Sequence, residues 1–362
     1  MNGISYKANA ADVLERLRLL WEERVQDRIF AVFHVPSPTL AEFAESHPEG
    51  FCEYPDPNER IALWDALLAE RAALEDDSIP SAYLSEFDQG LYGGVFGGDV
   101  RFLCDPGTGW ISSMVPPLLD DWSEFDALAF DESHPWFQRY LEQLRIFVEG
   151  AEGKFGISHL ILIDGLNFAF ELVGATNTYL AMHERPEMVR KAIDFAFDLN
   201  VKVQDVFFQA VQAASRGTFS NMIQWHQGRI VSESVDPFHM TSVDDFEKWG
   251  REPVQRVFDH YDGGVLHIHG NGRHLLEAVC SLRGLKAVFM GDDRGFPRAI
   301  DVADDLKRHA GDMPLVILIE YADFGERLEQ GSLVGGVLYN VSGAPDIDAA
   351  NRCMETVRAY RV

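Results

Sequence analysis

The sequence is poor in basic residues. Its 362 residues include 31 Lys and Arg against 58 Asp and Glu, which gives a formal charge of −27. Proteins that bind nucleic acid nonspecifically present a basic face to the phosphates, so that class is excluded. No run approaches the roughly 20 apolar residues needed to span a bilayer, and the N-terminal segment lacks the apolar stretch of a signal peptide. We therefore expect a soluble, cytoplasmic protein with no nucleic-acid or membrane partner.

Several familiar motifs are also missing. The four cysteines, Cys52, Cys104, Cys280 and Cys353, lie far apart with no CxxC pair, so neither a disulfide scaffold nor a zinc knuckle is indicated. This cysteine usage is typical of a reducing cytoplasm. The sequence has no GxSxG elbow and no GxxxxGKS/T phosphate loop.

Short apolar runs separated by helical segments dominate what the sequence does contain. Most of these segments have helical periodicity, and the clearest begins after Pro186, a residue suited to the first helical position. Buried strands that alternate with helices form parallel sheets covered on both faces, and eight such units predict a closed (β/α)₈ barrel. A doubly wound open sheet is the alternative, although no GxGxxG follows any run. The eight runs are residues 29–34, 81–85, 159–163, 220–225, 264–269, 286–290, 315–319 and 336–340.

We interpret residues 1–362 as a single barrel domain, although the length would also suit two domains. Residues 1–28 are expected to form an amphipathic helical extension within it. Residues 88–136 are rich in glycine and fit the alternation less well, so they are expected to be a hairpin-bearing insertion near the barrel mouth. The tryptophans Trp110, Trp122 and Trp136 are more typical of a core than of a ligand platform.

Catalytic residues in such a barrel lie at the C-terminal ends of the strands. His267 and His269 end the fifth run in LHIHGNG, and residues two apart on a strand point to the same side, here the barrel interior. Two imidazoles provide half of a zinc site, which needs three or four ligands. The alternative is one hydrogen-bonded core histidine beside a solvent-facing neighbour. Glu320 follows the seventh run, so we expect a buried carboxylate at the rim or a salt bridge to Arg294 or Arg298.

Other carboxylates follow the second and sixth runs. Asp292 and Asp293 can hold a metal, orient a histidine or bind a cationic substrate, and helix capping is favoured for Asp293. Glu86 and Asp88 follow the second run near the same rim, where one is expected to be functional and the other a solvated loop charge.

The loop after the fourth run concentrates titratable groups. His226, Glu233, Asp236 and His239 lie within it, and such a group can supply a general base. The alternative is ordinary turn chemistry at Asp236 before a helix that begins near Ser242.

The order of these segments resembles the uroporphyrinogen decarboxylase-like superfamily. The segment DGLNFAFELVGATNTYLAMHERPEMVRKAIDFAFDL is similar to the family's third-strand loop and the helix after it. FHMTSVDDFEKWGREPVQRVFDHYDGGVLHIHGNGRHLLEAV and GGVLYNVSGAP are similar to two later regions. The family contains the tetrapyrrole decarboxylase and the zinc- and corrinoid-dependent methyltransferases. The resemblance covers most of the chain and implies a (β/α)₈ barrel.

The two branches of the family are represented unequally. The decarboxylase's arginine-rich first loop is here FHVPSPTL, without arginine, and its final GHG is replaced by Ser342-Gly343-Ala344. His267 matches the methyltransferases' zinc-binding histidine, whereas His269 replaces a cysteine of their His-x-Cys pair, and YNVSGAPD lacks the further cysteine.

The resemblance implies a zinc-assisted, corrinoid-linked methyltransferase acting on a small methylated compound. Zinc ligands would be His267, His269 and Glu320, the corrinoid would sit on a separate partner protein, and a homodimer is the general expectation. One alternative is a decarboxylase or lyase acting on a small acid or tetrapyrrole through Glu86 and the histidines. Another is a metal-free barrel used for binding or regulation. The residues assigned to catalysis are Glu86, Asp236, His239 and Asp292.

Overall fold

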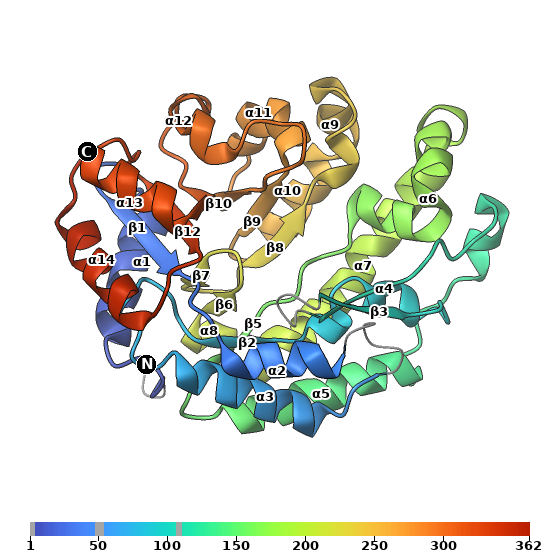
Figure 1. Ribbon diagram of the computed structural model, residues 1–362. Helices are drawn as coiled ribbons and strands as arrows, with labels where there is room; N and C mark the ends of the chain where they lie inside the picture. Colours follow the sequence, from blue (N-terminus) through green and yellow to red (C-terminus); the bar gives the residue numbers. More distant parts are fainter. Residues whose placement is uncertain (1–3, 48–53, 106–110) are drawn as a thin grey trace.

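A computed structural model describes residues 4–47, 54–105 and 111–362. Strands occupy the middle of the molecule and helices surround them (Figure 1). The strands are β1 (Ile29–Phe33), β2 (Ser81–Tyr83), β3 (Arg101–Cys104), β4 (Ile111–Met114), β5 (Gly156–Ser158), β6 (Thr218–Ser220), β7 (Gln224–His226), β8 (Val231–Ser234), β9 (Gly264–Ile268), β10 (Leu285–Met290), β11 (Leu315–Glu320) and β12 (Val337–Ser342).

Helices connect most successive strands. They are α1 (Ala10–Trp21), α2 (Pro38–Ser46), α3 (Pro57–Glu70), α4 (Gly90–Gly94), α5 (Pro135–Ala151), α6 (Gly165–Glu184), α7 (Pro186–Ala210), α8 (Ala213–Arg216), α9 (Val243–Trp249), α10 (Arg251–His260), α11 (Leu276–Cys280), α12 (Ala303–Ala310), α13 (Tyr321–Gln330) and α14 (Ile347–Ala359). The 3₁₀ turns are η1 (Ser85–Phe87), η2 (Trp122–Ala127), η3 (Asp236–Phe238), η4 (Gly270–Leu275) and η5 (Ala299–Val302). In the described parts of the chain, no helix combines the length and the apolar character needed to cross a membrane.

The strands form a mainly parallel, barrel-like arrangement in two sheets. One sheet has the order β1-β12-β11-β10-β9-β8 and is parallel throughout. The other has the order β2-β5-β6-β7, in which β7 runs antiparallel to β6. A single parallel bridge between Ile161 and Ser232 links the sheets on one side. No ladder joins β1 to β2 within residues 4–47, 54–105 and 111–362, so the continuous eight-stranded ladder of a closed barrel is not observed.

Seven of the eight predicted runs overlap strands, and two of the eight need correction. The third run, 159–163, follows β5 instead of forming it and contributes only the bridge at Ile161. The fourth, 220–225, contains the turn of the β6–β7 hairpin. Strand β8 was missed because its sequence, VSES, is half serine and shows no apolar run.

Alternate residues of the strands pack into two cores. Phe30, Val265 and Val316 face an inner core, which Leu17 and Trp21 of α1 complete. Their sequence neighbours on the same strands face an outer core shared with the surrounding helices. Helix α7, the helix predicted to begin after Pro186, packs on this outer core with Val189, Ile193, Val203 and Phe207 buried. Parallel strands covered on both faces are therefore confirmed.

The glycine-rich residues 88–136 contain α4, the antiparallel β3–β4 hairpin and η2. Trp122 is buried and Trp136 packs against the outer core, as expected. Trp110 and Cys52 lie outside the described residues, while Cys104, Cys280 and Cys353 are free thiols.

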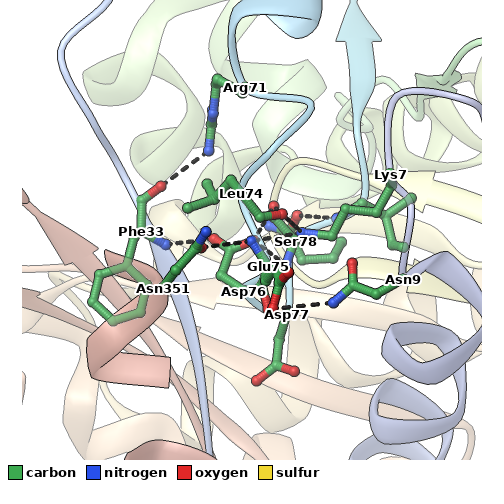
Figure 2. Close-up of polar contacts among 12 residues, drawn as sticks. Lys7, Asn9, Phe33, Arg71, Leu74, Glu75, Asp76, Asp77, Ser78 and Asn351 are labelled. Atoms are coloured by element: carbon green, nitrogen blue, oxygen red, sulfur yellow. Dashed lines mark hydrogen bonds and ion pairs between the residues drawn. The ribbon is translucent and has the colours of Figure 1, made fainter. Parts of the chain in front are cut away.

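Two aspartates supply β1 with hydrogen bonds on the side that faces β2. Phe33 N–H donates to Oδ2 of Asp76 (2.7 Å) (Figure 2). Ala31 N–H donates to Oδ2 of Asp77 (2.9 Å). The backbone N–H of Asp77 returns a bond to the carbonyl of Ala31 (2.9 Å). Buried backbone groups need partners, so these carboxylates act where a neighbouring strand would otherwise act.

Two cations neutralise these buried carboxylates. Nζ of Lys7 lies 2.8 Å from Oδ1 of Asp76, and Nε of Arg16 lies 2.6 Å from Oδ1 of Asp77. Burial opposes ionisation of Asp76, but the charges of Lys7 and Arg71 and hydrogen bonds from Lys7 and Ser78 hold its pKa below the usual value. The segment before β1 is thereby tied to the seam between the sheets.

Replacing Asp76 with Ala should lower the free energy of unfolding by about 3–5 kcal/mol, because the ammonium of Lys7 would stay buried without a partner. Asp312→Ala is the matched control, since the Arg24–Asp312 pair is exposed and such pairs contribute about 0–1 kcal/mol. Urea denaturation followed by circular dichroism measures both variants. Equal, small losses would show that the seam does not depend on Asp76.

Candidate functional site

The two histidines of LHIHGNG lie together at the C-terminal end of β9. His267 is on the strand and His269 follows it, and their ring centroids are 4.4 Å apart. Across the ladder His267 is paired with Phe289 of β10 and Ser234 of β8, and the ring of Phe289 meets its imidazole edge-on at 5.2 Å. The expectation that both side chains point to one side of the strand is confirmed.

Neighbouring loops add a third imidazole and two carboxylates. The centroid of His239 lies 5.5 Å from that of His269. Oδ1 of Asp236 is 3.4 Å from Nδ1 of His239 and 3.9 Å from Nε2 of His269. Nδ1 of His269 is 3.0 Å from Oδ1 of Asp293. We call Asp236, His239, His267, His269 and Asp293 the histidine cluster.

Burial makes two of the cluster's imidazoles neutral at pH 7. It lowers the pKa of His239 to about 4, although the charge of Asp236 opposes this shift. Burial and the charge of neighbouring His269 lower the pKa of His267 to about 4. Burial alone would raise the pKa of Asp293. Hydrogen bonds from Asn271 N–H and His269 outweigh this effect and bring the pKa below its usual value. Neutral imidazoles next to ionised carboxylates can accept protons, donate hydrogen bonds or ligate a metal.

Two glycines allow the imidazoles to lie this close to the backbone. A Cβ at position 291 would stand 2.7 Å from Nε2 of His267, and one at position 272 would overlap the ring of His239. Gly291 and Gly272 therefore belong to the construction of the site. The sequence offered one signal for each glycine: Gly291 immediately follows β10, and Gly272 is the last residue of GNG.

The expectation that Glu320 is buried at the rim is wrong. Its side chain is exposed, because β11 ends there beside Ser342, the equally exposed last residue of β12. The alternative salt bridge to Arg298 is not formed either, since Arg298 pairs with Asp301 and Asp323. In the portion of the chain that the structure describes, no group of three His, Cys, Asp or Glu side chains is arranged to hold a metal ion.

Asp292 has contacts typical of a structural residue. Its Oδ1 accepts hydrogen bonds from Arg273 (3.1 Å) and from the backbone N–H of Ala299 (2.6 Å) at the start of η5. The sequence favoured capping for Asp293, yet Asp293 is the carboxylate that contacts His269. Both aspartates therefore accept a backbone N–H at the start of a 3₁₀ turn, Asp293 from Asn271 and Asp292 from Ala299, and Asp293 also contacts a histidine.

Glu86 is buried away from solvent and paired. Arg60 of α3 forms an ion pair with its Oε1, and Nε2 of Gln143 donates to its Oε2 (2.9 Å). These contacts join α3 and α5 to η1. Neither Arg60 nor Gln143 belongs to the histidine cluster. A catalytic role for Glu86 or Asp292 stays a prediction.

A second carboxyl pair, which the sequence did not reveal as a pair, is buried beneath β8. Asp164, before α6, and Glu233 of β8 interact through a side-chain hydrogen bond. Burial raises the pKa of Asp164 to about 6. Burial and the charge of Asp164 raise the pKa of Glu233 well above its usual value, so both carboxyls of the pair bind a proton more readily than free carboxyls do.

Comparisons with known proteins give a fold without a family. No family model matches the sequence, and no curated protein matches it. A solved structure described as a methyltransferase from Methanosarcina mazei aligns with a TM-score of 0.61 and 15% sequence identity. The alignment covers 99% of this chain and 99% of that chain. The whole chain therefore has the fold of that protein.

The Asp164–Glu233 pair should make stability fall as pH rises. A carboxyl with a raised folded-state pKa binds more protons folded than unfolded, so its stabilisation is lost as pH rises through the folded pKa. The free energy of unfolding of the Glu233→Gln variant should therefore decline less between pH 5 and pH 8 than that of the wild type. Urea titrations at several pH values provide the measurement. Exposed Glu149→Gln on α5 is the control, and a wild-type slope in both variants would contradict this reading.

Proposed function

We propose that the protein is a methyltransferase whose reaction centre is the histidine cluster. One observation supports this above the others: three imidazoles and two carboxylates meet at the C-terminal ends of parallel strands, where barrel enzymes carry their active sites. The full-length likeness to a protein named as a methyltransferase adds to this proposal, as does the match of His267 to the family's histidine.

Zinc fits the chemistry of these donors. Metal ligation needs neutral imidazoles, and His239 and His267 are neutral. Nε2 of His239 is buried and has no hydrogen-bond partner among the described residues. Asp293 engages Nδ1 of His269, an arrangement that orients a metal-binding histidine through its other nitrogen. As they stand, no three of the described side chains are placed to hold the ion together.

We infer the following roles for the chain's own residues. His267, His269 and His239 would hold the zinc, with Asp236 the adjacent carboxylate and Glu320 the ligand proposed from the sequence. Bound zinc supplies Lewis acidity that lowers the pKa of a thiol, hydroxyl or amine on the methyl acceptor. Asp236, half-exposed and next to two imidazoles, accepts the proton released by that acceptor. Phe289 and Ser234 flank His267 on the neighbouring strands, and the ring of Phe289 packs edge-on against its imidazole. A corrinoid on a separate partner protein would carry the methyl group.

Protein purified without an affinity tag should contain about one zinc per chain, as a site with open coordination for substrate requires. His267→Ala and His269→Ala should each remove it, and Glu320→Gln should weaken it if Glu320 is a ligand. Elemental analysis measures the content, and His309→Ala on the exposed face of α12 is the control. Full zinc content in both cluster variants would rule out this metal site.

The methyl-transfer reaction can be followed with free cobalamin. Mixing the zinc-loaded protein with methylcobalamin and small thiols should demethylate the corrinoid, and its absorbance reports the change. His239→Ala should lower the rate by roughly 10²–10⁴-fold if this imidazole takes part in proton transfer. No turnover with any thiol, alcohol or amine would count against the methyltransferase.

A lyase acting on a small acid is a second candidate, and the His269–Asp293 contact favours it. A carboxylate 3.0 Å from one ring nitrogen fixes the tautomer of the imidazole and leaves the other nitrogen as a general base. This reaction needs no metal. Activity that survives prolonged chelation, on a carboxylic acid substrate, would favour the lyase over the methyltransferase.

A further inference from the structure

Two adjoining cavities lie near β1 and β2, apart from the histidine cluster. The outer chamber has a volume of about 700 Å³ and lies between α2, α3 and the residues that follow β1. The inner chamber has a volume of about 180 Å³ and lies among β1, β2, β5 and β6. His34, Trp64, Leu67 and Arg71 line both chambers, so these residues mark their junction.

The outer chamber is largely apolar. Leu40 and Ala41 of α2, Leu63 and Trp64 of α3, and Ile111 of β4 contribute to its wall. Its volume is within the range of about 300–1,000 Å³ typical of small-molecule sites, which combine apolar walls with a few polar groups. A ligand that fills this chamber therefore has an apolar body.

The cationic side chains that line the chambers differ in whether they have an ion-pair partner. Arg60 is neutralised by Glu86, and Lys7 by Asp76. Arg71 forms no ion pair within the described residues, and its Nη2 donates to the carbonyl of Phe33 (3.0 Å) (Figure 2). A guanidinium has five N–H donors, so others remain for a ligand. The charge of Arg71 interacts with Asp76, but Lys7 is the ion-pair partner of that carboxylate, so a positive charge with no ion pair of its own among the described residues stands at the junction, in a protein of net charge −27.

His34 and the inner chamber complete a set of hydrogen-bonding groups around Arg71. Desolvation by the residues around it and the charge of Arg71 lower the pKa of His34, although part of its side chain reaches solvent, and its Nε2 donates to Oδ1 of Asn340 (2.5 Å). The inner wall carries hydroxyl groups, two of which, on Ser81 and Ser158, are hydrogen-bonded to each other at 2.7 Å. An anionic head group next to Arg71 would meet the guanidinium and the hydroxyl groups of this wall, whereas Nε2–H of His34 is already donated to Asn340.

We propose that the two chambers form a binding site for a small organic acid with an apolar body. The carboxylate binds the guanidinium of Arg71, as charge-assisted bonds favour, and the body fills the outer chamber. None of the residues of the histidine cluster lines either chamber. The proposed acid site therefore does not depend on methyl transfer. It would bind an anion on a chain whose net negative charge otherwise repels anions.

Isothermal titration calorimetry tests the site with butyrate, hexanoate, octanoate and 4-phenylbutyrate, each compared with its neutral amide. At least one acid should bind roughly tenfold or more tightly than its amide, since a hydrogen bond to a charged group contributes that much. Arg71→Gln should abolish this preference. Arg308→Gln, which removes the same charge from the exposed face of α12, should retain it.

A second variant tests the apolar chamber without altering Arg71. Ala41→Trp should fill the outer chamber and weaken binding of both acid and amide at least tenfold. His267→Ala should bind as the wild type does, which separates this site from the proposed reaction centre. Absence of binding by all four acids, equal affinity for acid and amide, or a retained preference in Arg71→Gln would each overturn the proposal.

Discussion

The arrangement of the whole molecule depends on two adjacent carboxylates, Asp76 and Asp77. They take the N–H groups of β1 that a neighbouring strand would otherwise receive, and so they hold the edge of the six-stranded sheet against the segment that leads into β2. Charged acceptors can do this in a buried place only when cations accompany them. Lys7 and Arg16, from the segment before β1, fill that requirement.

The contacts of Asp76 and Asp77 between the two sheets also affect Arg71 and the inner chamber next to them. Asp76 is close enough to Arg71 for the two charges to interact, and Arg71 in turn donates to the last residue of β1. The inner chamber occurs where the sheets approach each other without a shared ladder. Carboxylate pairing in place of strand pairing leaves room for polar groups inside the fold, whereas the interior of a barrel is ordinarily filled with side chains.

The sequence predicted the features that depend on periodicity. Parallel buried strands, helix α7 and the common direction of His267 and His269 all follow from repeats of two or 3.6 residues. It did not predict features that depend on where a chain segment ends. β8 carries serines because its inner face is polar, and Glu320 is exposed because the neighbouring strand ends at the same level.

Contacts between loops were equally beyond the sequence. His239, Asp236 and Asp293 lie in segments that meet only after β8, β9 and β10 are aligned, and spacing along the chain does not report such meetings. Capping was favoured for Asp293, which does accept the N–H of Asn271, but the N–H of Ala299, in the segment that follows the two aspartates, is bound by Asp292. Asp76 and Asp77 look like any exposed acidic pair until their cations are placed.

The pairing of β1 with β12 has a consequence for how the molecule forms. Residues 29–33 take their ladder partners from residues 337–341, so nearly the whole chain separates the two strands. Closing so long a loop is entropically costly and slow. During synthesis β1 emerges long before β12, so the edge of β1 that pairs with residues 337–341 has no strand partner until those residues are made. A strand edge left open in this way is a site for pairing with other chains, so the growing protein is most prone to aggregation just before its last strand is made.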